Sequence, residues 1–357
     1  MENNIINNIS IRDYSKDDKA SIISLLSYLL NGFSESERME LFEWRYERNP
    51  YQNKPIIILA FSGDILVGFR AYLIQYFLIS DKKMTVISPA DTIIHPEYRR
   101  RGIISMLNKK SMEKIYLEYP YDSILLNTTT SKNAMPTYLK FDWFPCSNKK
   151  KVYGYRFSIF NILKSLLKTD KNSNKVDEIS FSDTGLIFEI AKNINKRKII
   201  EFIKTNRDKS KFTNLRDELF FDWRYSYERD KYLLISCYSN KNMLGYTIIK
   251  KSSNYEYSAE EYFAADSKIL RLMFKAIQKN MKIPIIRTII FSNEDKRIMK
   301  SCGFFVELNL FIKIFKKQRF PVLVRPTKPV LSNNDFLIGG VDIRDIENWQ
   351  LFQSDRH

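Results

Sequence analysis

The spacing of apolar residues changes between helical and strand periods along the first 94 residues. It predicts the order strand, helix, helix, strand, strand, strand. The expected elements are a strand at 9–12, helices at 16–30 and about 36–46, a hairpin of strands at 56–60 and 65–77, and a strand at 84–94.

The last of these strands runs through a basic turn into a helix. Pro96 ends the strand, three arginines at 99–101 fill the turn, and Gly102 precedes an amphipathic helix that carries lysines on its polar face. A glycine at this place lets a phosphate approach the backbone N–H groups at the start of the helix. We interpret the turn as a cofactor-phosphate site; the alternative is a basic turn between a buried strand and a surface helix.

A second segment follows about thirty residues later. The run 123–127 is typical of a buried strand, and Asn133, Tyr138 and Asp142-Trp143 come after it. Asn133 is a candidate N-cap, and Pro136 suits the first turn of a short helix. Tyr138 is either a core side chain or a functional one.

Together these segments resemble the GCN5-related N-acetyltransferases (the GNAT superfamily). The stretch 91–107 is similar to the family's pyrophosphate-binding motif, Gln/Arg-x-x-Gly-x-Gly/Ala after a strand, with Arg99 and Gly102 in place and Ile104 where the family usually has Gly or Ala. Asp142-Trp143 stands where the family has Gly-Phe after its tyrosine. The resemblance covers about residues 8–156 and includes the order of the elements.

The resemblance implies acetyl-CoA (coenzyme A) as the donor, a small-molecule amine as the acceptor, and Tyr138 as the catalytic general acid. It leaves Asp91 or Glu97 as the base. The cofactor-binding residues that it implies are Thr92, Ile93, Ile94, Arg99, Arg100, Arg101, Gly102, Ile103, Ile104, Ser105 and Asn133.

The chain also contains an internal repeat. Phe220 to Tyr225 repeats Leu41 to Tyr46, including the Trp-Arg-Tyr sequence, whose aromatic residues are expected to pack into a core. The counterpart of the phosphate turn, 261–269, has neither arginine nor glycine, and Met299 stands where the first copy has Tyr138. The sequence therefore predicts an α/β (α+β mixed sheet) protein with two GNAT-like acyl-CoA N-acyltransferase folds in tandem, the second without cofactor.

The expected domain limits follow from the repeat and from polar segments. They are an N-terminal acetyltransferase domain at 1–156, a helix and linker at 157–184 with a polar stretch at 169–175, a C-terminal GNAT-like domain at 185–320, and an extended tail at 321–357.

Composition and charge limit the classes of ligand and partner that the chain is expected to bind. The net charge of +17 suits a polyanionic ligand, but the lysines are scattered and favour a solvated surface, so nucleic acid is not the expected partner. Three widely spaced cysteines, with no Cys-x-x-Cys pair, and two histidines predict no metal site. No apolar run is long enough for a membrane span and no secretion signal is recognisable, which favours a cytoplasmic protein.

Two other functions remain open from the sequence. Aminoacyl-tRNA-dependent transferases that build cell-wall peptides also resemble two fused GNAT domains, although the intact arginine turn argues against that donor. A non-catalytic binding protein is the third hypothesis, and Ile104 and Asp142 are the residues that favour it. The acceptor is not defined by the sequence; an amino sugar or sugar nucleotide is the expectation from the resemblance.

Overall fold

The computed structural model describes residues 9–119, 123–150, 152–167, 179–183, 185–306 and 321–356. The chain forms two compact units, each of which combines two separate segments of sequence. Unit 1 comprises Met1–Cys146 and Val322–Arg344, and unit 2 comprises Ser147–Pro321 and Asp345–His357.

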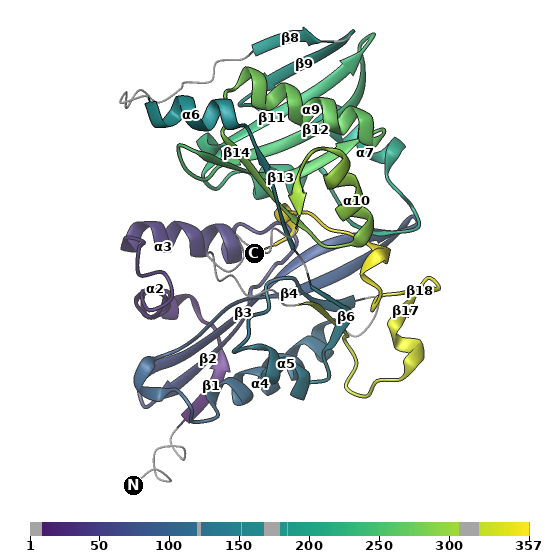
Figure 1. Ribbon diagram of the computed structural model, residues 1–357. Helices are drawn as coiled ribbons and strands as arrows, with labels where there is room; N and C mark the ends of the chain where they lie inside the picture. Colours follow the sequence, from purple (N-terminus) through teal and green to yellow (C-terminus); the bar gives the residue numbers. More distant parts are fainter. Residues whose placement is uncertain are drawn as a thin grey trace. The chain divides into compact units, whose positions relative to one another are not determined.

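Unit 1 is a mixed sheet covered by helices. Its strands run in the spatial order β1-β2-β3-β4-β5-β16-β6, with β4 and β5 parallel. The strands are β1 (Ile9–Asp13), β2 (Ile56–Ser62), β3 (Ile65–Ile79), β4 (Lys82–Ile94), β5 (Ser123–Asn127), β16 (Pro321–Pro326) and β6 (Phe144–Lys150), and the helices are α2 (Lys19–Leu26), α3 (Glu35–Phe42), α4 (Ile103–Glu118) and α5 (Met135–Lys140). Figure 1 shows α4 and α5 on one face of this sheet and α2 and α3 on the other.

The strand and helix periods seen in the sequence reappear in these elements. The predicted strand at 123–127 coincides with β5, and the helix after the basic turn is α4. The first predicted helix is shorter than expected, because α2 ends at Leu26 and a turn follows. The second predicted helix ends in a short π-helix, Glu43–Glu47, which carries the Trp-Arg-Tyr sequence.

The buried interior of unit 1 lies between the sheet and its helices. Ile94 and Val67 from the strands pack with Ile103 and Leu107 of α4. Gly68 allows this approach, because a Cβ at this position would lie 3.1 Å from both Ile103 Cγ2 and Ile94 Cδ1. Packing of α4 on the end of β4 therefore sets where the turn between them lies.

Unit 2 repeats the same order of elements around a second sheet. Its strands run in the order β15-β7-β14-β13-β12-β11-β9-β8. They are β15 (Phe305–Val306), β7 (Val152–Phe157), β14 (Ile285–Ile290), β13 (Glu256–Ala264), β12 (Asn242–Lys251), β11 (Tyr232–Ser239), β9 (Leu186–Ala191) and β8 (Ile179–Asp183), and the helices are α6 (Ile159–Leu167), α7 (Lys196–Asn206), α8 (Glu218–Arg224), α9 (Ser267–Asn280) and α10 (Asn293–Ser301).

The last part of the chain is built from short elements. In unit 1 these are η5 (Asn333–Phe336) and the small hairpin of β17 (Leu337–Ile338) and β18 (Val341–Asp342); in unit 2 they are η6 (Ile346–Asn348), β19 (Trp349–Gln350) and η7 (Gln353–Asp355), with β19 paired to β10 (Phe212–Asn214).

The domain limits differ from the predicted ones because two strands are exchanged between the halves of the sequence. β7 pairs with β14 and β15 of unit 2, so unit 1 ends at Cys146 instead of 156, and the C-terminal unit begins well before 185. β16 lies between β5 and β6 of unit 1, so the predicted tail begins as a sheet strand. The linker predicted at 169–175 lies outside the described residues.

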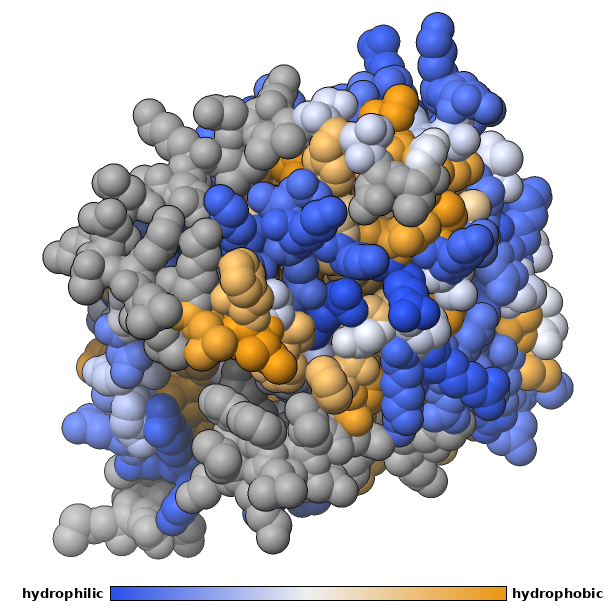
Figure 2. All heavy atoms as spheres, turned by 45° about the horizontal axis from the view of Figure 1, so that its top comes forward, coloured by the Kyte–Doolittle hydropathy of each residue, from blue (hydrophilic) through white to orange (hydrophobic). Residues whose placement is uncertain are grey.

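The displayed surface carries both hydrophilic and hydrophobic residues. Figure 2 shows hydrophilic side chains interspersed with small hydrophobic groups on the face that it displays. The described part of the chain contains no helix long and apolar enough to cross a membrane.

Candidate functional site

The turn between β4 and α4 presents unpaired backbone donors at a helix start. Gly102 is the N-cap of α4, with φ 76° and no side-chain cap. Its carbonyl accepts from Ser105 and Met106, which leaves the N–H groups of Ile103 and Ile104 without a partner among the described residues. Arg100 also has a positive φ of 64°. Left-handed residues in such a turn aim successive N–H groups at one side, which is the geometry of an anion site.

The three arginines of the turn are held differently. Arg99 donates its Nε–H to the Ile94 carbonyl at 3.2 Å, and the guanidinium of Arg101 lies 5.0 Å from the centre of the Tyr98 ring. Arg100 is exposed and makes no ion pair with another described residue. It is therefore the arginine that remains available to a phosphate.

Open space surrounds the start of α4. A Cβ on Gly102 would have no atom within 4 Å, and the Ile104 side chain is 39% exposed. The departure from the family motif at Ile104 thus leaves the helix start accessible. These residues fit a pyrophosphate, because donors, positive charge and space occur together.

Beside this turn, β4 and β5 separate. They pair only from Thr85 to Ile87, although β4 continues to Ile94. The His95 N–H bonds the Val67 carbonyl at 2.8 Å, and bonded pairs alternate along an antiparallel ladder. The N–H groups of Thr92 and Ile94 consequently face the edge of β4 that β5 leaves open.

Tyr138 lies on α5, after β5. Its ring is buried and packs edge-on against Trp143, with the ring centres 5.0 Å apart. The guanidinium of Arg70 is 5.4 Å from the centre of the Tyr138 ring, and Arg70 Nη1 donates to Thr92 Oγ1 at 3.0 Å. Arg70 thus links the predicted general acid to the predicted cofactor strand.

The sequence motifs did not indicate Arg70 as a candidate site residue. It is only 3% exposed, and its bonds go to Tyr72 and Thr92, with no carboxylate partner among the described residues. A buried cation without a counter-ion is energetically costly, which makes Arg70 a candidate functional residue. The signal that could have identified it is a single arginine within the otherwise largely apolar sequence of β3.

Asp91 is not free to act as a base. Arg45 Nη1 donates to both of its carboxylate oxygens at 2.7 Å, and the Tyr46 hydroxyl donates to Oδ2 at 2.7 Å. Burial, with the Asp91 charge, raises the pKa of Tyr46 well above its usual value. The repeated Trp-Arg-Tyr sequence therefore holds a buried carboxylate, while its aromatic residues pack in the core as predicted. Glu97 lies exposed in the turn and remains the other candidate.

The expected N-cap of α5 is wrong, and the backbone explains the residue that replaces the family's glycine. Asn133 is exposed and does not cap the helix: α5 begins at Met135 after Ala134, whose N–H donates to the Ser131 hydroxyl. Asp142 takes the place of glycine after the helix with φ 57°, a conformation that Asp tolerates better than most residues.

Unit 2 has the same framework with different residues at the equivalent places. Phe304 donates its N–H to the Met299 carbonyl as Trp143 does to Tyr138, so Met299 is the structural counterpart of Tyr138. At the start of α9, the Asp266 carboxylate accepts the Ile269 N–H. This cap uses one of the donors and places a negative charge where the first copy is open.

Among the described residues, no group of three or more His, Cys, Asp or Glu side chains is arranged to hold a metal ion.

Comparisons with known proteins agree with this geometry. A family described as acetyltransferase (GNAT) domain matches residues 10–145. No curated protein matches the chain significantly.

Several solved structures share the fold at low sequence identity. A probable N-acyltransferase from Enterococcus faecalis is 13% identical, with a TM-score of 0.60 over 89% of this chain and 72% of that one. A GCN5-related N-acetyltransferase from Anabaena variabilis is 10% identical, with a TM-score of 0.61 over 90% and 73%. A tandem GNAT protein from the clavulanic acid biosynthesis pathway is 11% identical, with a TM-score of 0.52 over 90% and 100%.

The matched residues 10–145 contain the helix start at Gly102, the open edge of β4 and Tyr138. The similarity to a tandem structure extends over both sheets. Residues 10–145 thus form a GNAT acetyltransferase domain, and the chain as a whole has the fold of two GNAT-like domains in tandem.

Proposed function

We propose that this protein transfers an acetyl group from acetyl-CoA to a primary amine, and that unit 1 alone performs the chemistry. The observation that carries the proposal is the uncapped start of α4 at Gly102, beside the open edge of β4. An acetyltransferase needs an anion site for the donor and backbone donors beside the thioester, and these two features supply both.

In this proposal the donor is held by groups of the turn and of β4. The N–H groups of Ile103 and Ile104, with the charge of Arg100, bind the pyrophosphate. The unpaired N–H groups of Thr92 and Ile94 bind the part of the donor that lies along the strand. Asn133, which is exposed, lies further along the chain on the connection to α5.

Bound acetyl-CoA supplies an activated acyl thioester. A strand N–H at Thr92 or Ile94 stabilises negative charge on the carbonyl oxygen while the amine nitrogen bonds to the carbonyl carbon. As the carbon–sulfur bond breaks, the Tyr138 hydroxyl donates its proton to the sulfur. Arg70 beside the Tyr138 ring stabilises the phenolate that remains until Tyr138 is reprotonated. The amine proton passes to solvent, directly or through Glu97.

The acceptor belongs to the proposal only as a class. An amino group of a sugar or sugar nucleotide is suggested by the resemblance of residues 91–105 to enzymes of that kind. Turnover assays that follow thiol release, run with amino sugars, aminoglycosides and polyamines, would identify the acceptor. Activity with none of these amines, together with no binding of coenzyme A, would leave a non-catalytic protein.

The donor assignment is tested by titrating the full chain with coenzyme A in a calorimeter. We expect one molecule per chain, since Asp266 caps the equivalent helix in unit 2. Two molecules per chain would contradict the assignment of unit 2. Co-purified tRNA with no affinity for coenzyme A would instead favour an aminoacyl-tRNA-dependent transferase.

A further inference from the structure

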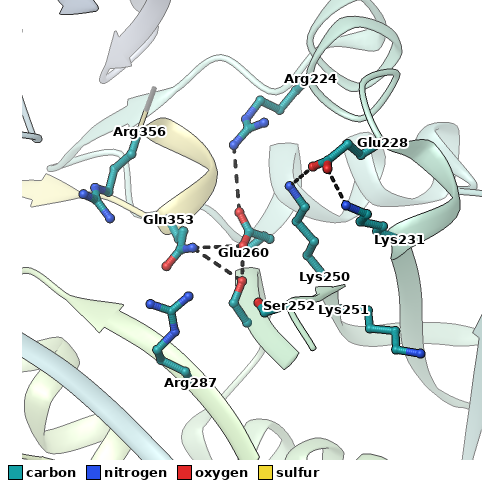
Figure 3. Close-up of a pocket in the computed structure, with 11 residues that line it drawn as sticks. Arg224, Glu228, Lys231, Lys250, Lys251, Ser252, Glu260, Arg287, Gln353 and Arg356 are labelled. Carbon is teal, nitrogen blue, oxygen red and sulfur yellow. Dashed lines mark hydrogen bonds and ion pairs between the residues drawn. The ribbon is translucent and has the colours of Figure 1, made fainter. Parts of the chain in front are cut away.

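Unit 2 contains a hollow with a basic wall on the side of its sheet where β12, β13 and β14 meet the C-terminal segment. Its volume is about 420 Å³, within the range of small-molecule sites. Figure 3 shows the side chains that surround it. They are Arg224, Glu228, Lys231, Lys250, Lys251, Ser252, Ser258, Glu260, Arg287, Gln353 and Arg356.

The lining carries more positive than negative charge. Six of its side chains are Lys or Arg and two are Glu. Glu228 pairs with both Lys231 and Lys250, and Glu260 lies 3.8 Å from Arg224. The two carboxylates are therefore engaged by three of the cations that line the hollow.

Arg287 and Arg356 provide the cationic end of the hollow. Arg287 has one carboxylate partner, Glu256, at 3.0 Å, which does not line the hollow. Arg356 makes no ion pair with a carboxylate among the described residues, and its buried Nε has no hydrogen-bond acceptor there. Burial lowers the pKa of Arg356 and the charge of Arg287 acts in the same direction, while a hydrogen bond with Tyr153 and the charge of Glu260 oppose this shift. These two guanidinium groups would be stabilised by an anion placed between them.

Next to these guanidinium groups, toward the lysine-lined side of the hollow, lie neutral and acidic hydrogen-bonding groups. The Gln353 amide donates to Glu260 Oε1 at 3.0 Å, and the Ser258 hydroxyl donates to the same carboxylate. Figure 3 shows Gln353 between the guanidinium groups and Glu260. Carboxylate and amide oxygens accept from hydroxyl groups, whereas they would repel a long polyanion.

We propose that this hollow in unit 2 binds a small phosphate monoester with hydroxyl groups, such as a sugar phosphate, with the phosphate at Arg287 and Arg356 and the hydroxyl groups toward Glu260 and Gln353. Guanidinium groups match phosphate oxygens in pairs, and the volume accommodates one such molecule. All residues of this hollow belong to unit 2, whereas the proposed donor site is built from residues of unit 1.

Calorimetric titration with glucose 6-phosphate tests the proposal. The titrated protein is full-length Gly102→Glu, so that phosphate binding at the α4 turn does not contribute. Saturable binding is expected, and glucose alone should not bind. Arg287→Gln and Arg356→Gln should each weaken binding about ten- to a hundred-fold, as expected for a lost charge-assisted hydrogen bond. Arg197→Gln is the matched control, because Arg197 is 88% exposed on α7 in the same unit and outside the hollow.

A variant that is expected to raise the affinity controls for loss of binding through misfolding. Glu228→Gln frees Lys231 and Lys250 from their carboxylate, so it should strengthen binding several-fold. The proposal is overturned by absence of binding at millimolar ligand, by equal binding of glucose, or by arginine variants that keep parental affinity. Retention of thermal unfolding temperature by each variant shows that a loss of binding is not a loss of folding.

Discussion

Gly102→Glu is the most direct test of the donor site. The substitution places a carboxylate at the N-cap of α4, in open space, where the proposed pyrophosphate meets the N–H groups of Ile103 and Ile104. The side chain also has to accept φ 76°, which costs non-glycine residues about 1 kcal/mol of folding free energy.

The effect on binding comes mainly from charge. Two like unit charges about 4 Å apart repel by about 1 kcal/mol in water and about 4 kcal/mol near a protein surface. The pyrophosphate carries more than one charge, and the new carboxylate also competes for the same N–H donors. A loss of about 3 kcal/mol is expected, which corresponds to a Kd for coenzyme A roughly a hundred-fold higher. Arg100→Ala should raise the Kd less, because it removes one exposed cation.

The assay is calorimetric titration with coenzyme A at low ionic strength, where exposed charges are least screened. Gly63→Glu is the matched control: Gly63 has φ 59°, no atom within 4 Å of an added Cβ, and a place in the β2–β3 turn of the same unit. It carries the same strain and charge away from α4. If Gly102→Glu binds coenzyme A as Gly63→Glu and the parent do, the turn is not the donor site.

Three further predictions concern catalysis, strand exchange and pH. Tyr138→Phe keeps the ring against Trp143 and should lower turnover about a hundred- to ten-thousand-fold with unchanged coenzyme A affinity; an unchanged rate in steady-state assays would reduce Tyr138 to a packing role. Gly154→Val should lower the free energy of unfolding by about 1–3 kcal/mol in urea titrations, because a Cβ there would lie 2.9 Å from Ile290 Cδ1; Gly32→Val, in open space, is its control, and equal stability of the two would contradict the position of β7. Burial raises the pKa of Asp295 to about 6, so its contribution to stability is complete below about pH 4 and is lost as the pH rises through about 6. Asp295→Asn should remove this slope and stabilise the protein at pH 7 by at most about 3 kcal/mol; parallel pH profiles of urea unfolding for variant and parent would refute it.

The strand exchange also changes how unit 2 can be studied. A fragment of residues 185–320, the limits predicted from the sequence, would lack β7, which pairs with β14 over six residues. The free edges of β14 and β15 would then be unpaired and prone to association. Binding to unit 2 is therefore measured in the full chain.

Local signals in the sequence were sufficient to predict the elements around the basic turn at 99–102. Pro96, the arginines at 99–101 and Gly102 act through backbone conformation within a few residues, so the end of β4 and the start of α4 were predictable. The repeat of Trp44 at Trp223 indicated two similar folds for the same reason, since each copy encodes its own elements.

Pairings between distant segments were decided only by the tertiary structure. β7 and β16 are short strands whose partners lie more than a hundred residues away, and an alternating pattern does not name a partner. The contacts of Arg45 and Arg70 depend in the same way on side chains from other elements: Asp91 for the first, and Thr92 and Tyr138 for the second. The hollow of unit 2 joins Arg287 on β14 to Arg356 at the end of the chain, because packing, and not proximity in sequence, places these charges together.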